Sequence, residues 1–176
     1  MASSNGIGET HTQFFTLATK DRPFIFADGG VVSDAVIAYE SYGTLNEKKD
    51  NAVLLFHALS GSQHAAGVTR AVPGVGSRWT ADCQQGWWDA YIGPGKAVDT
   101  SRYFVICANW LGGCYGTTGP SSIDPETGKP YASRFPSVRT SDVVRSQAML
   151  LDHLGIHQLH AVIGSSVGGL LAQNFA

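Results

Sequence analysis

Three short runs of mainly apolar residues constrain the fold of this chain more than any other feature. They span residues 52–56, 103–108 and 159–163. Runs of this length without alternation are typical of strands buried on both faces of a parallel sheet. A helical pattern separates the second run from the third, and another follows the third. This order of strand, helix, strand and helix predicts an α/β fold with right-handed crossovers.

Weaker patterns predict the remaining elements. Residues 14–18 and 35–42 favour two earlier strands. Thr140 or Ser141 is suited to cap a helix whose first turn holds Asp142, and Gly155 is suited to the left-handed position just past its end. Residues 62–99 are polar and rich in glycine, but they contain Trp79, Trp87 and Trp88, so we expect a packed loop rather than a disordered one. We expect one domain over residues 1–176, with about the first twelve residues flexible.

Composition excludes several classes of function. The formal net charge is −2, so no broad basic surface suits nucleic acid. No apolar run is long enough to span a bilayer, and residues 1–8 are too polar for a secretory signal. The three cysteines, Cys83, Cys107 and Cys114, are too few and too scattered for a disulfide framework. They suit a reducing, cytoplasmic location, and Cys107 is expected to be a small core residue.

The sequence Gly164-Ser165-Ser166-Val167-Gly168 contains the pattern Gly-x-Ser-x-Gly between a predicted buried strand and a predicted helix. In this setting the pattern indicates a nucleophile elbow, a sharp turn that exposes a serine hydroxyl at the edge of the sheet. Ser166 is therefore the candidate catalytic nucleophile. Gly164 and Gly168 would let the flanking backbone pass closely. The alternative is a glycine-rich turn that only packs a helix against the sheet.

A second motif, residues 57–61, follows the first buried strand. In this fold that loop and the residue after the nucleophile supply the backbone N–H groups of the oxyanion hole, which predicts Leu59 and Val167 as the donors. His57 is expected to be a hydrogen-bonded structural residue, because the catalytic His of the fold follows the serine in the chain.

Other chemistries find little support. Residues 93–96 read Gly-Pro-Gly-Lys, but Ala97 follows and no strand precedes them, so a phosphate-binding loop is not indicated. The histidines lack metal-ligand spacing, and we expect neither a metal nor a bound cofactor.

Several segments together resemble the homoserine O-acetyltransferase family. They appear in the family's order: His-Ala-Leu-Ser-Gly at 57–61, Gly-Trp-Trp-Asp at 86–89, Ile-Gly-Pro-Gly-Lys-Ala at 92–97, Leu-Gly-Gly-Cys-Tyr-Gly at 111–116, Thr-Gly-Pro-Ser-Ser at 118–122, and the Ser166 elbow. The likeness runs from about residue 37 to the end. The family elbow usually reads Gly-Gly-Ser-Met-Gly-Gly, so Ser165 replaces a glycine and Val167 a methionine.

The resemblance implies an α/β-hydrolase fold and an acyltransferase. Ser166 would take an acetyl group from acetyl-CoA and pass it to the hydroxyl of L-homoserine, a step of methionine biosynthesis. Acetyl-CoA is a substrate here, and no cofactor is implied. The full-length form would be a homodimer. Alternatives are a homoserine or serine O-succinyltransferase, and an esterase or thioesterase of the same fold.

The family's catalytic Asp and His, its helical lid and its final strands would all follow residue 176. We therefore expect this chain to be an N-terminal part of the domain, truncated after the elbow, and to be inactive by itself.

Overall fold

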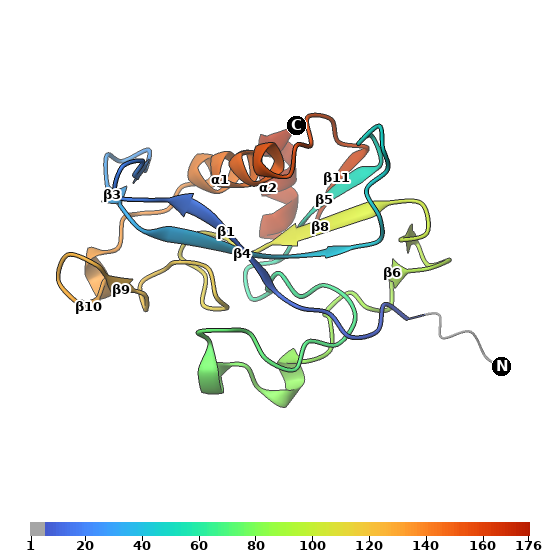
Figure 1. The fold of residues 1–176 in the computed structure, drawn as a ribbon, viewed down its shortest axis with the longest axis horizontal. Coiled ribbons are helices and arrows are strands. Elements are labelled where there is room, and N and C mark those ends of the chain that lie inside the picture. The colour runs from blue at the N-terminus through green and yellow to red at the C-terminus, as the bar shows by residue number, and fades with distance from the viewer. Residues whose placement is uncertain (1–5) are drawn as a thin grey trace.

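A five-stranded sheet forms the centre of the computed structural model, which describes residues 6–176. Its strand order is β1 (Gln13–Ala18), β4 (Ala35–Tyr42), β8 (Phe104–Ala108), β5 (Ala52–Phe56) and β11 (Ala161–Gly164). β8, β5 and β11 are parallel, and β4 is antiparallel to both of its neighbours, so four of the five strands run in one direction (Figure 1). The predicted α/β fold with a mostly parallel sheet is confirmed.

Several short elements of secondary structure lie within the loops. Six of the strands are only two residues long, too short to show a period in the sequence, and they form three separate pairs. These pairs are β2 (Phe24–Ile25) with β3 (Val31–Val32), β6 (Ile92–Gly93) with β7 (Val98–Asp99), and β9 (Ile123–Asp124) with β10 (Lys129–Pro130). Three 3₁₀ turns, η1 to η3, span Gly76–Arg78, Ala81–Cys83 and Ala132–Arg134.

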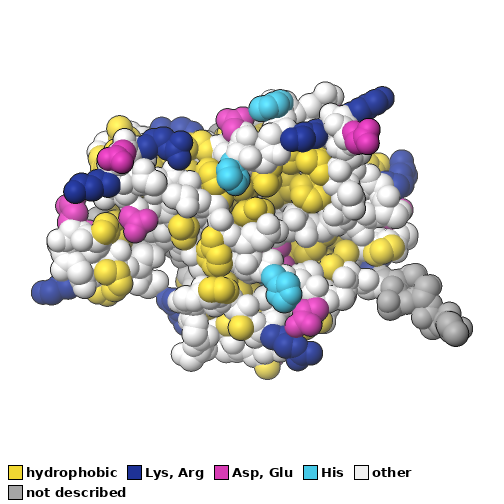
Figure 2. All heavy atoms as spheres, in the orientation of Figure 1, with side chains coloured by type: hydrophobic (Ala, Val, Ile, Leu, Met, Phe, Trp, Pro, Cys, Tyr) yellow, Lys and Arg dark blue, Asp and Glu magenta, His cyan; other side chains and the backbone are white. Residues whose placement is uncertain are grey.

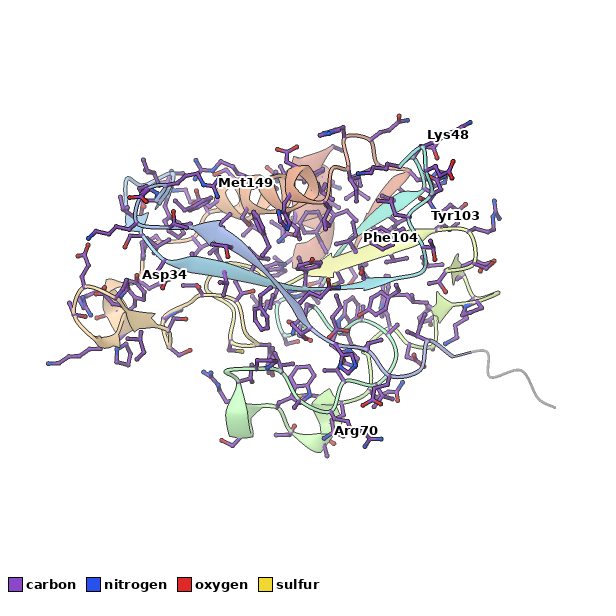
Figure 3. All side chains as sticks on the ribbon, in the orientation of Figure 1. Asp34, Lys48, Arg70, Tyr103, Phe104 and Met149 are labelled. Atoms are coloured by element: carbon purple, nitrogen blue, oxygen red, sulfur yellow. The ribbon has the colours of Figure 1, made fainter. Side chains whose placement is uncertain are left out.

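Two helices, α1 (Thr140–His153) and α2 (Val167–Phe175), lie on the same side of the sheet (Figure 1). Because side chains alternate along a strand, Leu54 and Phe56 of β5 point to this side. They form one apolar core with Leu150 of α1 and Leu171 of α2. Met149 of α1 packs against the same core (Figure 3). Burying each large apolar side chain stabilises the fold by about 1.5–3 kcal/mol.

The loop of residues 62–99 covers the opposite side of the sheet. Val53 and Leu55 of β5 pack there against Ala65 and Ala66. The loop is therefore packed, as its tryptophans predicted, and it takes the place of a covering helix.

A buried polar cluster holds this loop to the sheet. The Glu40 carboxylate on β4 and the His64 ring are each only 1% exposed. His64 Nδ1 lies 2.9 Å from Glu40 Oε2, and His64 Nε2 lies 2.9 Å from the Gln84 carbonyl oxygen. Thr12 and Thr69 donate to the other carboxylate oxygen. Every polar atom of Glu40 and His64 thereby has a partner, which burial requires.

The start of α1 differs from the prediction. Arg139 is the N-cap residue and Thr140 is already helical, so neither Thr140 nor Ser141 caps the helix. Asp142 supplies the missing acceptor: its carboxylate accepts hydrogen bonds from the Arg139 N–H at 3.0 Å and from the distant Ala27 N–H at 2.9 Å. The other end agrees with the prediction, because Gly155 has a φ of +66°.

At the N-terminus, residues 1–5 of the segment expected to be flexible lie outside the described residues. From Gly8 the backbone is attached to the long loop, since Val68 accepts a hydrogen bond from Thr10 N–H and donates one to the Gly8 carbonyl oxygen. Within the described residues, neither helix is long and apolar enough to cross a membrane.

The edge strands of the sheet are β1 and β11, and within the described residues β11 pairs with β5 alone, so the outer edge of β11 is open. A hollow of about 400 Å³ beside this edge is lined by Leu151, Ile156, Leu159, Val162 and Phe175, among others. Figure 2 shows apolar side chains gathered on the surface where Figure 1 draws α2 and β11.

Candidate active site

Ser166 occupies the turn between β11 and α2, as the motif predicted. Its backbone has φ 55° and ψ −127°, values that residues other than glycine rarely adopt. The α2 helix begins at the next residue, and Gly169 N–H donates to the Ser166 carbonyl oxygen at 2.9 Å. Ser166 is exposed rather than buried in a helix. Strained geometry of this kind is concentrated at functional sites, where it aims a side chain.

Gly164 and Gly168 allow this turn because a side chain fits at neither position. A Cβ atom on Gly164 would lie 2.1 Å from the Gly168 carbonyl oxygen. A Cβ atom on Gly168 would lie 2.3 Å from the Phe56 oxygen and 2.6 Å from the His57 oxygen. The backbone in the first turn of α2 is therefore in close contact with the backbone at the end of β5. Ser165 stands where the family usually has glycine, but it is not one of the residues with positive φ, so its backbone needs no glycine.

The predicted oxyanion donors come from neighbouring parallel strands. Gly164 of β11 pairs with Phe56 of β5, so the loops that carry Val167 and Leu59 leave the same edge of the sheet. Both residues line one cavity of about 550 Å³. Within the described residues, neither backbone N–H donates a hydrogen bond to another protein atom. Free N–H groups beside an exposed serine are the components of an oxyanion hole. The Leu59 side chain itself is 74% exposed.

His57 supports the loop that holds Leu59. The residue is 2% exposed, its Nδ1 lies 2.7 Å from the Ala58 carbonyl oxygen, and its ring stacks on Trp110 with the ring centres 4.4 Å apart. The hydrogen bond to Ala58 requires a proton on Nδ1. Burial lowers the pKa of His57 from its usual value of 6.5, which favours the neutral ring at neutral pH. These contacts are those of the structural histidine that the sequence predicted.

The walls of the cavity are mostly apolar and come from segments far apart in the chain. Trp110 and Leu111 follow β8, Phe135 and Pro136 precede α1, and Leu171 lies on α2. Sequence reasoning missed Trp110, Phe135 and Pro136 as site residues. The Leu-Gly-Gly-Cys motif at 111–114 was a signal for the β8 loop, because Gly112, Gly113 and Cys114 also line the cavity. Nothing in the sequence pointed to residues 135–136.

The site has a nucleophile without a base in the part of the chain that is described. No side chain of residues 6–176 hydrogen-bonds to the Ser166 hydroxyl, and none of the described histidines does so. No group of three or more His, Cys, Asp or Glu residues in the same range could hold a metal ion. Cys107 is fully buried, as expected, and burial raises its pKa well above the usual value. Cys114 is exposed at the cavity.

Known proteins share both the sequence and the fold of this chain. Homoserine O-acetyltransferase of Deferribacter desulfuricans is 51% identical over 172 residues, which cover 98% of this chain and 42% of the relative. Serine O-succinyltransferase of Emericella nidulans is 52% identical over 150 residues, covering 85% of this chain and 27% of the relative. The resemblance to the homoserine O-acetyltransferase family is confirmed.

Two solved structures have the same fold. Homoserine O-acetyltransferase from Bacillus anthracis has a TM-score of 0.79 and 40% identity, with coverage of 94% of this chain and 42% of that one. Esterase E22 has a TM-score of 0.78 and 38% identity, with coverage of 93% and 42%. The chain therefore spans about two fifths of the length of several proteins that it matches. Residues 51–176 match the model of the alpha/beta hydrolase fold family, and the chain belongs to that family.

Proposed function

We propose that the whole protein carrying this chain moves an acetyl group from acetyl-CoA to the hydroxyl of L-homoserine through an acetyl-Ser166 intermediate. One observation carries the proposal: Ser166 lies at a strained turn, next to a cavity lined by two residues with free backbone N–H groups, Leu59 and Val167. The similarity to homoserine O-acetyltransferases supports the choice of substrates. The serine O-succinyltransferase among the relatives supports the coarser class, acyl transfer to the hydroxyl of a small amino acid.

In the first half of the reaction, Ser166 Oγ attacks the thioester carbonyl carbon while a base removes its proton. The carbonyl oxygen becomes an oxyanion, which accepts hydrogen bonds from the N–H groups of Leu59 and Val167. The C–S bond then breaks, and CoA leaves as a thiol after it takes up the proton. In the second half, the homoserine hydroxyl attacks the acetyl carbon and its proton passes to the same base. The bond between the acetyl carbon and Ser166 Oγ then breaks, and the base returns the proton to Ser166 Oγ.

The base in this proposal is a histidine outside residues 1–176, oriented by an Asp that is also outside them, as the order of the fold requires. His57 does not suit the role, because it is buried and its Nδ1 proton is held by Ala58. We accordingly propose that residues 1–176 alone form no acetyl-enzyme at a useful rate. The cytoplasm and a homodimer remain our proposals for the whole protein, and acetyl-CoA and homoserine are its only proposed partners.

Hydrolysis is the second candidate, because the structural match to esterase E22 is as close as that to the acetyltransferase. Both reactions share the acyl-serine intermediate and differ in what attacks it. Transfer requires an acceptor site and the exclusion of water.

The test is to mix the whole protein with acetyl-CoA and to measure its intact mass and its peptides. The proposal predicts one added acetyl group on the peptide containing Ser166, its removal by homoserine with formation of O-acetylhomoserine, and no label in Ser166→Ala. Ser165→Ala is the matched control and should keep the label. Rapid acetate release that homoserine does not change would favour the esterase. A strong preference for succinyl-CoA would favour the succinyltransferase.

A further inference from the structure

The cavity beside Ser166 contains one charge. Among its lining residues only Arg139 is ionisable as a strong acid or base, and no Asp or Glu contributes to the lining. The surrounding walls, Trp110, Phe135, Pro136 and Val138, are apolar. Arg139 is exposed, so water solvates its guanidinium, and it is the only cation among the residues that line this cavity.

No part of the described chain neutralises this cation. The Arg139 guanidinium makes no ion pair, hydrogen bond or cation–π contact with residues 6–176, although Arg134 and Arg145 pair with Asp124 and Asp142. The nearest carboxylate along the chain, Asp142, is 1% exposed and already accepts from two backbone N–H groups and from Arg145. Arg139 is exposed and keeps all five of its N–H donors free for a ligand.

The backbone of Arg139 is fixed even though its side chain is free. Arg139 N–H donates to Asp142 at 3.0 Å, and the Arg139 carbonyl oxygen accepts from Asp142 and Val143 N–H at 3.0 and 3.2 Å. The Arg139 backbone, from which the side chain extends, is therefore fixed at the start of the 14-residue helix α1. An anchored, planar donor group is suited to oxygen anions, which it can bind through two parallel hydrogen bonds.

We propose that Arg139 is a specificity-determining residue of this site, which recognises the anionic group of a substrate whose reacting part lies in the apolar cavity. The inference rests on the proposed function, because it takes the cavity beside Ser166 as the substrate site. Two sources supply the required chemistry. They are the phosphates of an acyl-CoA, with the apolar arm in the cavity, and the carboxylate of the amino-acid acceptor.

Binding of three ligands to the whole protein separates these sources. CoA carries the arm and the phosphates, pantetheine carries the arm without phosphates, and L-homoserine carries the carboxylate. Dissociation constants are measured for the wild type, Arg139→Gln and Arg139→Lys. Arg22→Gln is the matched control, because Arg22 is also exposed and unpaired in the described residues but lines a different hollow.

We expect Arg139→Gln to weaken binding of either CoA or homoserine by about tenfold, the value for one partly solvated charged contact, and to leave pantetheine unchanged. Arg139→Lys should recover part of the loss, and Arg22→Gln should have no effect. The affected ligand identifies the source. Salt should weaken binding of that ligand more in the wild type than in Arg139→Gln, because the lost contact is a charge pair.

The proposal is overturned if neither anionic ligand loses affinity in Arg139→Gln, if pantetheine loses as much as CoA, or if no ligand binds the wild type. The proposed function is tested separately with p-nitrophenyl acetate, a neutral acyl donor. Its acetylation of Ser166 should be equal in the wild type and in Arg22→Gln, because Arg22 lies away from the cavity. If p-nitrophenyl acetate acetylates Ser166 in neither protein, the proposed function is refuted. The dissociation constants test the role of Arg139 independently of this result.

Discussion

Replacing Gly168 with alanine should destabilise the elbow through a backbone collision. The new Cβ atom would lie 2.3 Å from the Phe56 oxygen and 2.6 Å from the His57 oxygen, whereas ordinary contacts begin at 3.4 Å. Both obstacles are backbone atoms at the end of the buried β5 strand, so no side chain can rotate away. The α2 helix must move by about 1 Å to relieve the contact.

Overpacking of this kind costs about 1–3 kcal/mol, and the rigid surroundings favour the upper end. Alanine recovers at most about 1 kcal/mol through its higher helix propensity. The net loss is therefore about 2 kcal/mol in the free energy of unfolding, which for a domain of this size lowers Tm by about 4–8 °C. Thermal unfolding followed by circular dichroism measures it.

The neighbouring residue provides the control. Gly169 lies in the same helix, has no positive φ, and would place a Cβ atom no closer than 3.5 Å to other atoms. Gly169→Ala should therefore leave Tm unchanged or raise it, through helix propensity. The packing argument is refuted if Gly168→Ala melts at or above the wild-type temperature, or if the two variants lose equal stability.

Three further predictions follow from burial and from the open sheet edge. Because the pKa of His57 is lowered in the fold, the unfolded chain binds more protons than the folded chain as pH falls below the usual value of 6.5, so the free energy of unfolding should decrease there. Urea unfolding between about pH 7 and pH 5 measures this decrease, which should be smaller in His57→Gln. An equal decrease in both proteins would show that His57 is not responsible. A thiol reagent should modify exposed Cys114 rapidly and buried Cys107 only on unfolding, as mapped by peptide mass spectrometry; rapid labelling of Cys107 in the native chain would contradict the packing of β8. Residues 1–176 alone should self-associate through the open edge of β11 and the apolar hollow beside it. Val162→Lys should reduce this self-association, as measured by sedimentation. A wild-type chain that stays monomeric at high concentration would refute the prediction.

The sequence predicted the elements whose signals are local. Residues 52–56 form a strand with the predicted bounds. All five of its residues are buried, and a continuous apolar run is the local sequence signal of such a strand. The elbow was predictable for the same reason, since strand, serine turn and helix are contiguous. The two-residue strands could not be predicted, because two residues carry no periodicity.

Features that depend on contacts between segments far apart in the chain could not be predicted from the sequence. The cap of α1 was misassigned because Asp142 bonds to Ala27, 115 positions away, and no local pattern records that contact. The placement of β8 between β4 and β5, the stack of Trp110 on His57 and the approach of residues 135–136 to the cavity depend equally on the tertiary fold. The nucleophile was thus visible in the sequence, whereas most of the cavity beside it was not.

A crystal structure of the whole protein after reaction with a phosphonate ester would test the central claim most directly, because the tetrahedral adduct imitates the oxyanion intermediate. Our account predicts an adduct on Ser166 Oγ, with one phosphonyl oxygen within hydrogen-bonding distance of both the Leu59 and the Val167 N–H groups. An adduct on Ser165, or a phosphonyl oxygen that contacts neither amide, would contradict it.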